Sequence, residues 1–232
     1  TFQILMMNRW YSITRKRYAI LFSMLLSLHL IVFSALNVDK LRNSYRQLGG
    51  NEQTFSDWIT LMNSLSDQSA EIKIQRVNSF FNKKLAYFEE IEIWAQSDYW
   101  ATPLESMSKG RADCEDFVIA KYFSLRHLNI PDTQLRLVYV KAKIGGASST
   151  VQQAHMVLAY YPNVDGEPVI LDNLITDIRP ASRRNDLSPV FSFNSQGIFA
   201  GVAGNAQMGP GGTSRLSRWQ DLLDKAHREG FE

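Results

Sequence analysis

The sequence predicts an α+β protein in which a helical N-terminal lobe packs on an antiparallel β-sheet. Apolar residues recur at the 3.6-residue spacing of amphipathic helices up to about residue 128. Asn129 and Pro131 then end the helical pattern, and the apolar spacing changes to two, which is the period of strands. A chain of 232 residues is long enough to bury one core, or a core with a small helical lobe.

Residues 1–36 have the pattern of a leader. No acidic residue precedes Leu36, but four basic ones do, namely Arg9, Arg15, Lys16 and Arg17. The uncharged apolar run at 18–36 that follows them is typical of a secretory signal peptide. The run is also nearly long enough to be retained as an inner-membrane anchor. A cleaved signal is the favoured interpretation, and in either case the rest of the chain is expected to be exported.

The formal charge of +2 comes from this leader. Beyond it, 21 basic residues stand against 23 acidic ones, so the exported part of the chain is close to neutral. A nucleic-acid-binding surface requires clustered positive charge, and the sequence therefore does not support a nucleic-acid partner.

The helical lobe is expected at residues 37–93. Thr54 and Asp57 have the spacing of a capping box for its second helix, and Asp67 or Ser69 is the expected cap of the third. The apolar repeats at helical spacing lie at 38–48, 54–65 and 74–88.

Residues 94–194 are expected to form the core that carries the chemistry. A loop at 94–103 leads to a helix that begins near Cys114, and strands rich in Val, Ile, Leu, Tyr and Phe follow. Turn residues at 162–168 join the second and third strands as an antiparallel hairpin. The expected strands are 135–142, 154–161, 169–172 and 190–193. The remaining residues, 195–232, are expected to form a glycine-rich surface loop and an amphipathic C-terminal helix.

Cys114, the only cysteine in the chain, stands where a polar loop gives way to an apolar helix. The unpaired N–H groups and the positive end of the dipole at a helix N-terminus favour the thiolate, which is the nucleophilic form. A lone cysteine cannot form an internal disulfide, so a free thiol in an exported protein points to a functional role. The alternative is a buried cysteine that serves as a small hydrophobic residue.

Three carboxylates, those of Asp113, Glu115 and Asp116, flank Cys114. They oppose its ionisation, because a nearby like charge disfavours a second anion. Two interpretations are open. Acidic residues suit the first turn of a helix, with Asp113 as the N-cap. Alternatively, a hard cation such as Ca²⁺ binds the carboxylates, cancels their charge and leaves the thiolate free to attack.

His155 is the one histidine at the start of a predicted strand, and Asp172 closes the next strand across the hairpin. An acid in that position is able to accept the imidazole N–H and fix its tautomer. A cysteine on a helix followed by a histidine and an aspartate on successive strands is the arrangement of papain-like and transglutaminase-like enzymes. The register of a hairpin cannot be read from sequence, so the proximity of His155 and Asp172 is an inference.

Five short runs extend this pattern: Tyr99 to Pro103, Asp113 to Asp116, Leu135 to Val140, Ala154 to Leu158 and Leu171 to Leu174. Together they resemble the bacterial transglutaminase-like cysteine proteinases, over residues 94–193 and more weakly over the preceding helices. The resemblance implies a papain-like/transglutaminase-like cysteine protease fold. It also implies that Cys114 is the nucleophile, His155 the general base and Asp172 the orienting residue. The implied calcium ligands are Asp113 and Glu115, with Asp116 as a weaker addition.

The resemblance further implies a calcium-dependent periplasmic endopeptidase that cleaves the N-terminal region of a large surface adhesin and releases cells from a biofilm. The implied partner is a membrane receptor that senses cyclic di-GMP in the cytoplasm and sequesters the protease through its periplasmic domain. Two alternatives remain open. One is a transglutaminase-type acyl transferase, and the other is a non-catalytic, calcium-stabilised binding module.

Overall fold

A computed structural model describes residues 37–146, 148–201 and 217–231. They belong to Leu36–Glu232, the second of two compact units into which the chain divides. The predicted leader at 1–36 and most of the predicted glycine-rich loop lie outside the described residues. No helix within the described ranges combines the length and the apolar character that crossing a membrane requires.

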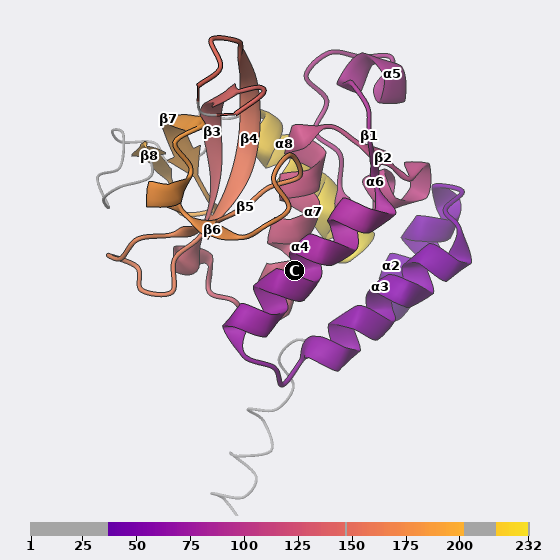
Figure 1. Ribbon diagram of the computed structural model, residues 1–232. Coiled ribbons are helices and arrows are strands. Elements are labelled where there is room, and N and C mark those ends of the chain that lie inside the picture. The colour runs from indigo at the N-terminus through magenta and orange to yellow at the C-terminus, as the bar shows by residue number, and fades with distance from the viewer. Residues whose placement is uncertain (1–36, 147, 202–216, 232) are drawn as a thin grey trace, which may run out of the picture. The chain divides into compact units, whose positions relative to one another are not determined.

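A six-stranded sheet forms one part of this unit, with strand order β6-β5-β4-β3-β7-β8 and antiparallel pairing throughout the described strands (Figure 1). The strands are β3 (Leu135–Lys143), β4 (Gln152–Tyr160), β5 (Val169–Leu171), β6 (Arg179–Pro180), β7 (Leu187–Phe193) and β8 (Ile198–Ala200). β3, β4, β5 and β7 match the four predicted strands, and β4 pairs with β5 in the predicted hairpin. The edge strands β6 and β8 were not predicted, because two or three residues are too few to show a period.

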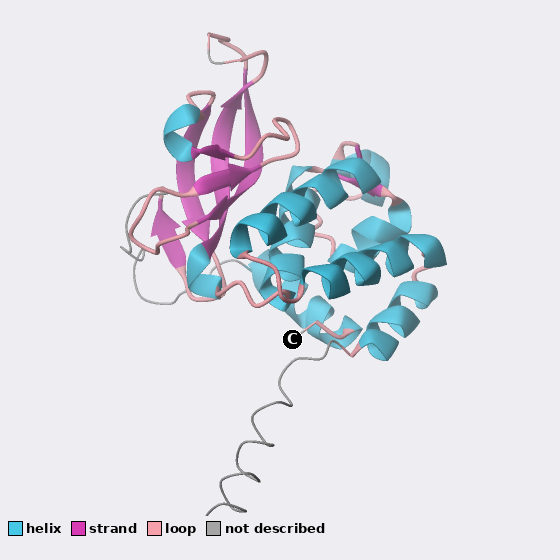
Figure 2. Cartoon of the chain, turned by 60° about the horizontal axis from the view of Figure 1, so that its bottom comes forward, coloured by secondary structure: helices cyan, strands magenta, loops and turns pink. Residues whose placement is uncertain are grey.

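The helices lie together beside the sheet, as Figure 2 shows for the described residues. They are α2 (Val38–Gln47), α3 (Glu52–Leu65), α4 (Ala70–Lys84), α5 (Glu90–Trp94), α6 (Pro103–Lys109), α7 (Cys114–His127) and α8 (Ser217–Glu229). A short parallel pair, β1 (Ala86–Tyr87) and β2 (Arg111–Ala112), joins the end of the first lobe to the start of α7. The α+β class is therefore confirmed.

The predicted cap of the second helix was wrong. α3 begins at Glu52, and its N-cap is Asn51, whose side chain accepts from the Gln53 backbone N–H at 2.8 Å. Asparagine is a strong N-cap, so the helix starts before Thr54. Ser69 caps α4, as predicted. α6 was not predicted, although Thr102 and Glu105 form a capping box with Pro103 in its first turn.

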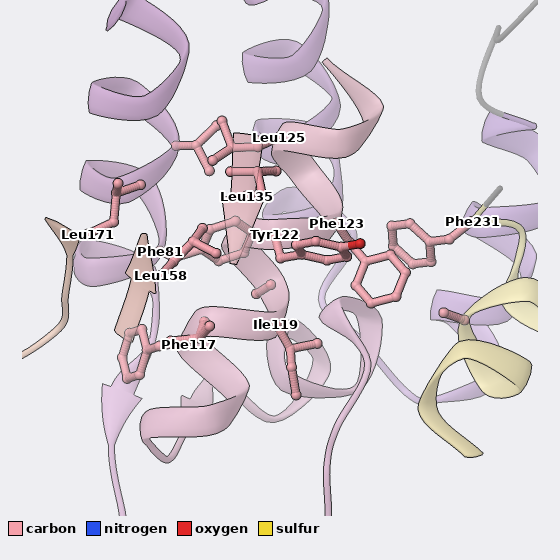
Figure 3. Packing of buried hydrophobic residues seen from close by; sticks show 14 of the residues in the cluster. Phe81, Phe117, Ile119, Tyr122, Phe123, Leu125, Leu135, Leu158, Leu171 and Phe231 are labelled. Carbon is pink, nitrogen blue, oxygen red and sulfur yellow. The ribbon is translucent and has the colours of Figure 1, made fainter. Parts of the chain in front are cut away.

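One apolar core joins the helices to the sheet, with α7 at its centre. Every residue from Asp116 to Leu125 is buried, because α7 packs against both α4 and β4. In Figure 3, Phe117 and Tyr122 of α7 lie among Phe81 of α4 and Leu158 of β4. The packing of α7 on both elements fixes its first residue, Cys114, relative to the strand that carries His155.

Candidate active site

The chain passes from the end of α6 to the start of α7 in a short turn. Gly110 ends α6 with a φ of 64°, the left-handed region that favours glycine. After the two residues of β2, Asp113 caps α7, and its Oδ1 accepts from the Asp116 backbone N–H at 3.0 Å. The predicted N-cap is thus confirmed, and Cys114 is the first residue of the helix.

Cys114 lies against β4, where its thiol meets the backbone of Met156, the residue after His155. Its half-buried Sγ donates to Glu115 Oε2 at 2.7 Å. Burial, followed by the charge and hydrogen bond of Glu115 and the charge of Asp113, raises the pKa of the thiol, while the backbone N–H of Met156 lowers it. Among the described residues, no hydrogen bond joins Sγ to the His155 imidazole. Burial and the neighbouring carboxylates together favour the protonated thiol, in the direction that the sequence predicts for the carboxylates.

His155 and Asp172 are brought together. The antiparallel pairing of Leu158 with Leu171 places the residue after β5 beside the middle of β4, close to His155. His155 Nε2 lies 2.8 Å from Asp172 Oδ1, and both side chains are buried. Because Nε2 faces the carboxylate, Nδ1 is the ring nitrogen left to exchange a proton with a nucleophile.

The Asp172 carboxylate is held from several directions. Oδ1 also accepts from the Leu174 backbone N–H at 3.0 Å, and Oδ2 accepts from Arg184 Nη2 at 2.7 Å. Burial alone would raise the pKa of this carboxyl, but the hydrogen bonds from His155 and Arg184 outweigh it and hold the pKa well below the usual range. Asp172 therefore stays ionised at neutral pH, which suits a residue that orients an imidazole.

Sequence reasoning missed two buried cations beside Asp172. Arg184 stands in a polar run, Arg183 to Asp186, that is typical of a solvated turn and carries no signal of burial. Lys121 did carry a signal, because α7 is apolar on all sides and such a helix is buried. Its side chain is fully buried, and its Nζ has no hydrogen-bond partner among the residues that the structure describes.

The three predicted calcium ligands lie around the first turn of α7. Asp113 and Asp116 are buried, and Glu115 is half-buried beside the thiol. Burial, together with the charges of the neighbouring carboxylates, raises the pKa of both aspartates. In the described part of the chain, no three His, Cys, Asp or Glu side chains converge as a metal site. The donor chemistry nevertheless fits calcium, which takes carboxylate oxygens, and a dication would offset the charge that these residues concentrate. The ligand assignment stays a prediction.

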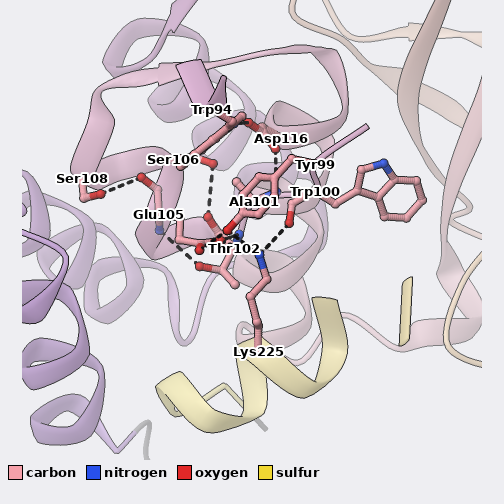
Figure 4. Close-up of polar contacts among 10 residues, drawn as sticks. All are labelled: Trp94, Tyr99, Trp100, Ala101, Thr102, Glu105, Ser106, Ser108, Asp116 and Lys225. Carbon is pink, nitrogen blue, oxygen red and sulfur yellow. Dashed lines mark hydrogen bonds and ion pairs between the residues drawn. The ribbon is translucent and has the colours of Figure 1, made fainter. Parts of the chain in front are cut away.

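Asp116 also anchors the loop before α6. Its Oδ1 accepts from the Ala101 backbone N–H at 2.9 Å, and its Oδ2 accepts from Trp94 Nε1 at 3.3 Å (Figure 4). Beyond Ala101, the Glu105 side chain accepts from the Thr102 backbone N–H at 2.8 Å and from Lys225 Nζ of α8 at 2.9 Å. The N-terminus of the cysteine helix is therefore tied to three other helices, directly to α5 through Trp94 and by way of the loop to α6 and α8.

Three comparisons with known proteins bear on this arrangement. The sequence profile of the family described as bacterial transglutaminase-like cysteine proteinase matches residues 57–186. No curated protein matches the chain.

Solved structures of one protein, Legionella pneumophila LapG, are similar to the chain at 36% sequence identity. One covers 80% of this chain and 96% of its own, with a TM-score of 0.64. A calcium-bound structure covers 81% and 98%, with a TM-score of 0.67. An EGTA-treated structure covers 80% and 96%, with a TM-score of 0.66.

Proposed function

The chain belongs to the bacterial transglutaminase-like cysteine proteinases, and on this premise we propose that it is a calcium-dependent cysteine endopeptidase with the triad Cys114, His155 and Asp172. The observation that carries the proposal is the buried 2.8 Å contact between His155 Nε2 and Asp172 Oδ1, on the strand against which the Cys114 thiol lies. A nucleophile, a base and an orienting acid on these elements are the parts that covalent acyl chemistry requires.

In the proposed reaction, His155 removes the thiol proton, and Cys114 Sγ attacks the carbonyl carbon of a peptide bond. The proton passes from His155 to the leaving amine, which leaves a thioester that water hydrolyses. The Cys114 backbone N–H, at the start of α7, supplies one hydrogen bond to the developing oxyanion. The thiol has to give up its hydrogen bond to Glu115 Oε2 before its proton reaches His155. Because Glu115 is also a proposed calcium ligand, calcium binding at Glu115 would free the thiol for this transfer.

Asp113 and Glu115 are the proposed calcium ligands, with Asp116 as a weaker addition because backbone and indole N–H groups already occupy its oxygens. A bound calcium ion would supply the positive charge that offsets these carboxylates beside the thiol. Calcium-bound and EGTA-treated structures of the similar Legionella protein support the choice of metal.

The proposed substrate is the N-terminal region of a large surface adhesin, whose cleavage releases cells from a biofilm. The proposed regulator is a cyclic di-GMP receptor resembling LapD, whose periplasmic domain sequesters the protease. The proposed location is the periplasm, reached through the leader at 1–36. The family membership and the leader pattern support these assignments.

The test mixes the purified protein with the N-terminal part of a large secreted adhesin encoded by the same genome. We expect cleavage with Ca²⁺, loss of cleavage in EGTA, recovery when Ca²⁺ is added back, and no cleavage by the Cys114→Ala variant. Full cleavage in EGTA would refute the calcium role. Incorporation of an amine into glutamine without peptide cleavage would favour a transglutaminase, and binding without cleavage by both forms would favour a binding module.

A further inference from the structure

Arg184 joins the carboxylate of Asp172 to a second acid. Its Nη2 donates to Asp172 Oδ2 at 2.7 Å and to Asp186 Oδ2 at 2.8 Å, while its Nε donates to Asp186 Oδ1 at 2.9 Å. The Arg184 side chain is 1% exposed, the Asp172 side chain 0% and the Asp186 side chain 13%. The fork on Asp186 fixes the plane of the guanidinium, because two parallel N–H···O bonds leave it little freedom to turn.

The two oxygens of Asp172 have separate partners. Oδ1 faces His155 Nε2 and the Leu174 backbone N–H, whereas Oδ2 faces Arg184. A carboxylate held at only one oxygen turns about its Cβ–Cγ bond, and the second contact removes that rotation. The titratable groups that face Asp172 come from three elements: His155 from β4, Lys121 from α7, and Arg184 from the segment between β6 and β7.

We propose that Arg184, anchored on Asp186, is a positioning residue that fixes the Asp172 carboxylate so that His155 keeps its proton on Nε2 and presents Nδ1 to Cys114. The proposal rests on the proposed triad and adds two residues to it. It acts through Asp172, since within the described part of the chain Arg184 donates to Asp172 and Asp186 and makes no hydrogen bond to the imidazole or the thiol.

The alternative is that Arg184 acts only through its charge. Two substitutions separate the alternatives, because Arg184→Gln removes a positive charge and Asp186→Asn removes a negative one. If Arg184 positions Asp172, both variants should shift the protonated ring nitrogen of His155 and the alkylation rate in the same direction. If Arg184 acts only through its charge, the two variants should shift them in opposite directions. Arg184→Lys keeps the charge without the planar fork. Arg183→Gln, at the exposed neighbouring arginine, is the matched control.

The experiment follows alkylation of Cys114 by iodoacetamide at neutral pH, in the full chain with excess Ca²⁺. The chain has one cysteine, so every alkylated thiol is Cys114. In parallel, the ¹⁵N chemical shifts of the His155 imidazole report which ring nitrogen carries the proton. Far-UV circular dichroism verifies that each variant is folded. If Arg184→Gln does not fold, Asp186→Asn and Arg184→Lys carry the test.

We expect Arg184→Gln and Asp186→Asn both to slow alkylation by about 10- to 100-fold, by analogy with the range for outer partners that orient metal-bound histidines. Both should also lose the single Nε2–H signature, Arg184→Lys should retain part of the rate, and Arg183→Gln should match the wild type. Rates that move in opposite directions, or do not move, would overturn the positioning role. A wild-type rate that His155→Ala leaves unchanged would instead overturn the triad, which is a distinguishable failure.

Discussion

The two buried cations beside Asp172 differ in how their charge is satisfied. Arg184 donates to two carboxylates, whereas the fully buried Lys121 Nζ makes no hydrogen bond to any described residue. Burial lowers the pKa of Lys121 to about 7, although the charge of Asp172 opposes the shift. A buried ammonium without hydrogen bonds is costly, so the protonated form of Lys121 destabilises the fold.

Substituting Lys121 by Met should stabilise the protein most at low pH. The unfolded chain keeps the lysine proton up to about pH 10.4, and the folded chain loses it near pH 7. The unfolded state therefore binds more protons between these values, and the free energy of unfolding of the wild type rises with pH across that window. At about 1.4 kcal/mol per pKa unit, the Lys121→Met variant should gain a few kcal/mol below pH 7 and lose this advantage as the pH rises.

Urea unfolding at pH 6, 8 and 9.5 measures the difference. Lys73→Met is the matched control, because Lys73 is also buried but its Nζ donates to the Leu128 carbonyl at 3.0 Å, so its loss should destabilise. Parallel pH dependences in the wild type and Lys121→Met would show that Lys121 does not change its protonation on folding.

At the residue scale, the sequence was informative where a functional side chain stands at the boundary of an element. Cys114 opens a helix, His155 lies near the start of a strand and Asp172 follows one, so each has a place that periodicity predicts. Arg184 stands in a polar turn, and its burial depends on how the segment between β6 and β7 folds over the sheet. No local sequence pattern predicts the path of that segment.

At the scale of elements, one residue in the first turn of α7 has two roles. Asp113 caps the helix, and the same carboxylate is a proposed calcium ligand. These roles make different demands on the side chain. A cap requires only an oxygen that accepts from a backbone N–H, and a calcium ligand set benefits from the negative charge.

The two roles are separable with Asp113→Asn and Asp113→Ala. Asparagine retains the cap, so in EGTA we expect Asp113→Asn to be at least as stable as the wild type, whereas Asp113→Ala should lose about 1 kcal/mol. Calcium at 100 times its dissociation constant should stabilise the wild type by about 2.7 kcal/mol. Asp113→Asn should show a smaller calcium-dependent rise in Tm. A full calcium response in thermal melts of Asp113→Asn would remove Asp113 from the ligand set.

The elements themselves were predicted as well as their periods allowed. The long strands β3 and β4 and the helices α2, α7 and α8 were predicted close to their bounds, whereas the pattern that predicted α4 ran on to residue 88 and the helix ends at Lys84. α6 was missed because seven residues hold too few apolar repeats, even though its capping box was present in the sequence. The pairing order of the strands required tertiary contacts, since β7 pairs with β3 across the intervening β4, β5 and β6.

At the scale of the whole unit, one continuous core includes the helices, the inner side of the sheet and α8. Trp219 of α8 is fully buried, and its ring centroid lies 5.3 Å from that of Phe193 of β7 and 5.4 Å from that of Tyr122 of α7. The C-terminal helix thus packs on both parts of the fold at once. The predicted family and fold class are confirmed at this scale.

Replacing Trp219 by Ala should therefore destabilise the helices and the sheet together. We expect a loss of about 3–5 kcal/mol, the usual cost of truncating a buried aromatic side chain. Far-UV and near-UV circular dichroism should report one coincident transition in chemical denaturation, as in a two-state domain. Leu223→Ala, at a partly buried position of the same helix, should cost less. A biphasic transition would show that the two parts unfold independently.

Two asparagines of α4 link the helical lobe to the segment that carries Asp172. Asn82 Nδ2 donates to the Asp172 carbonyl at 2.7 Å, and Asn78 Nδ2 donates to the Thr176 carbonyl at 3.0 Å. The stretch at 94–193 contains the cysteine, the histidine and the aspartate, but both amides lie outside it. An excised fragment of that length would keep the reactive groups but lose the two α4 hydrogen bonds that hold the segment after β5. Gene shuffling that exchanges the first lobe would have to carry these amides with it.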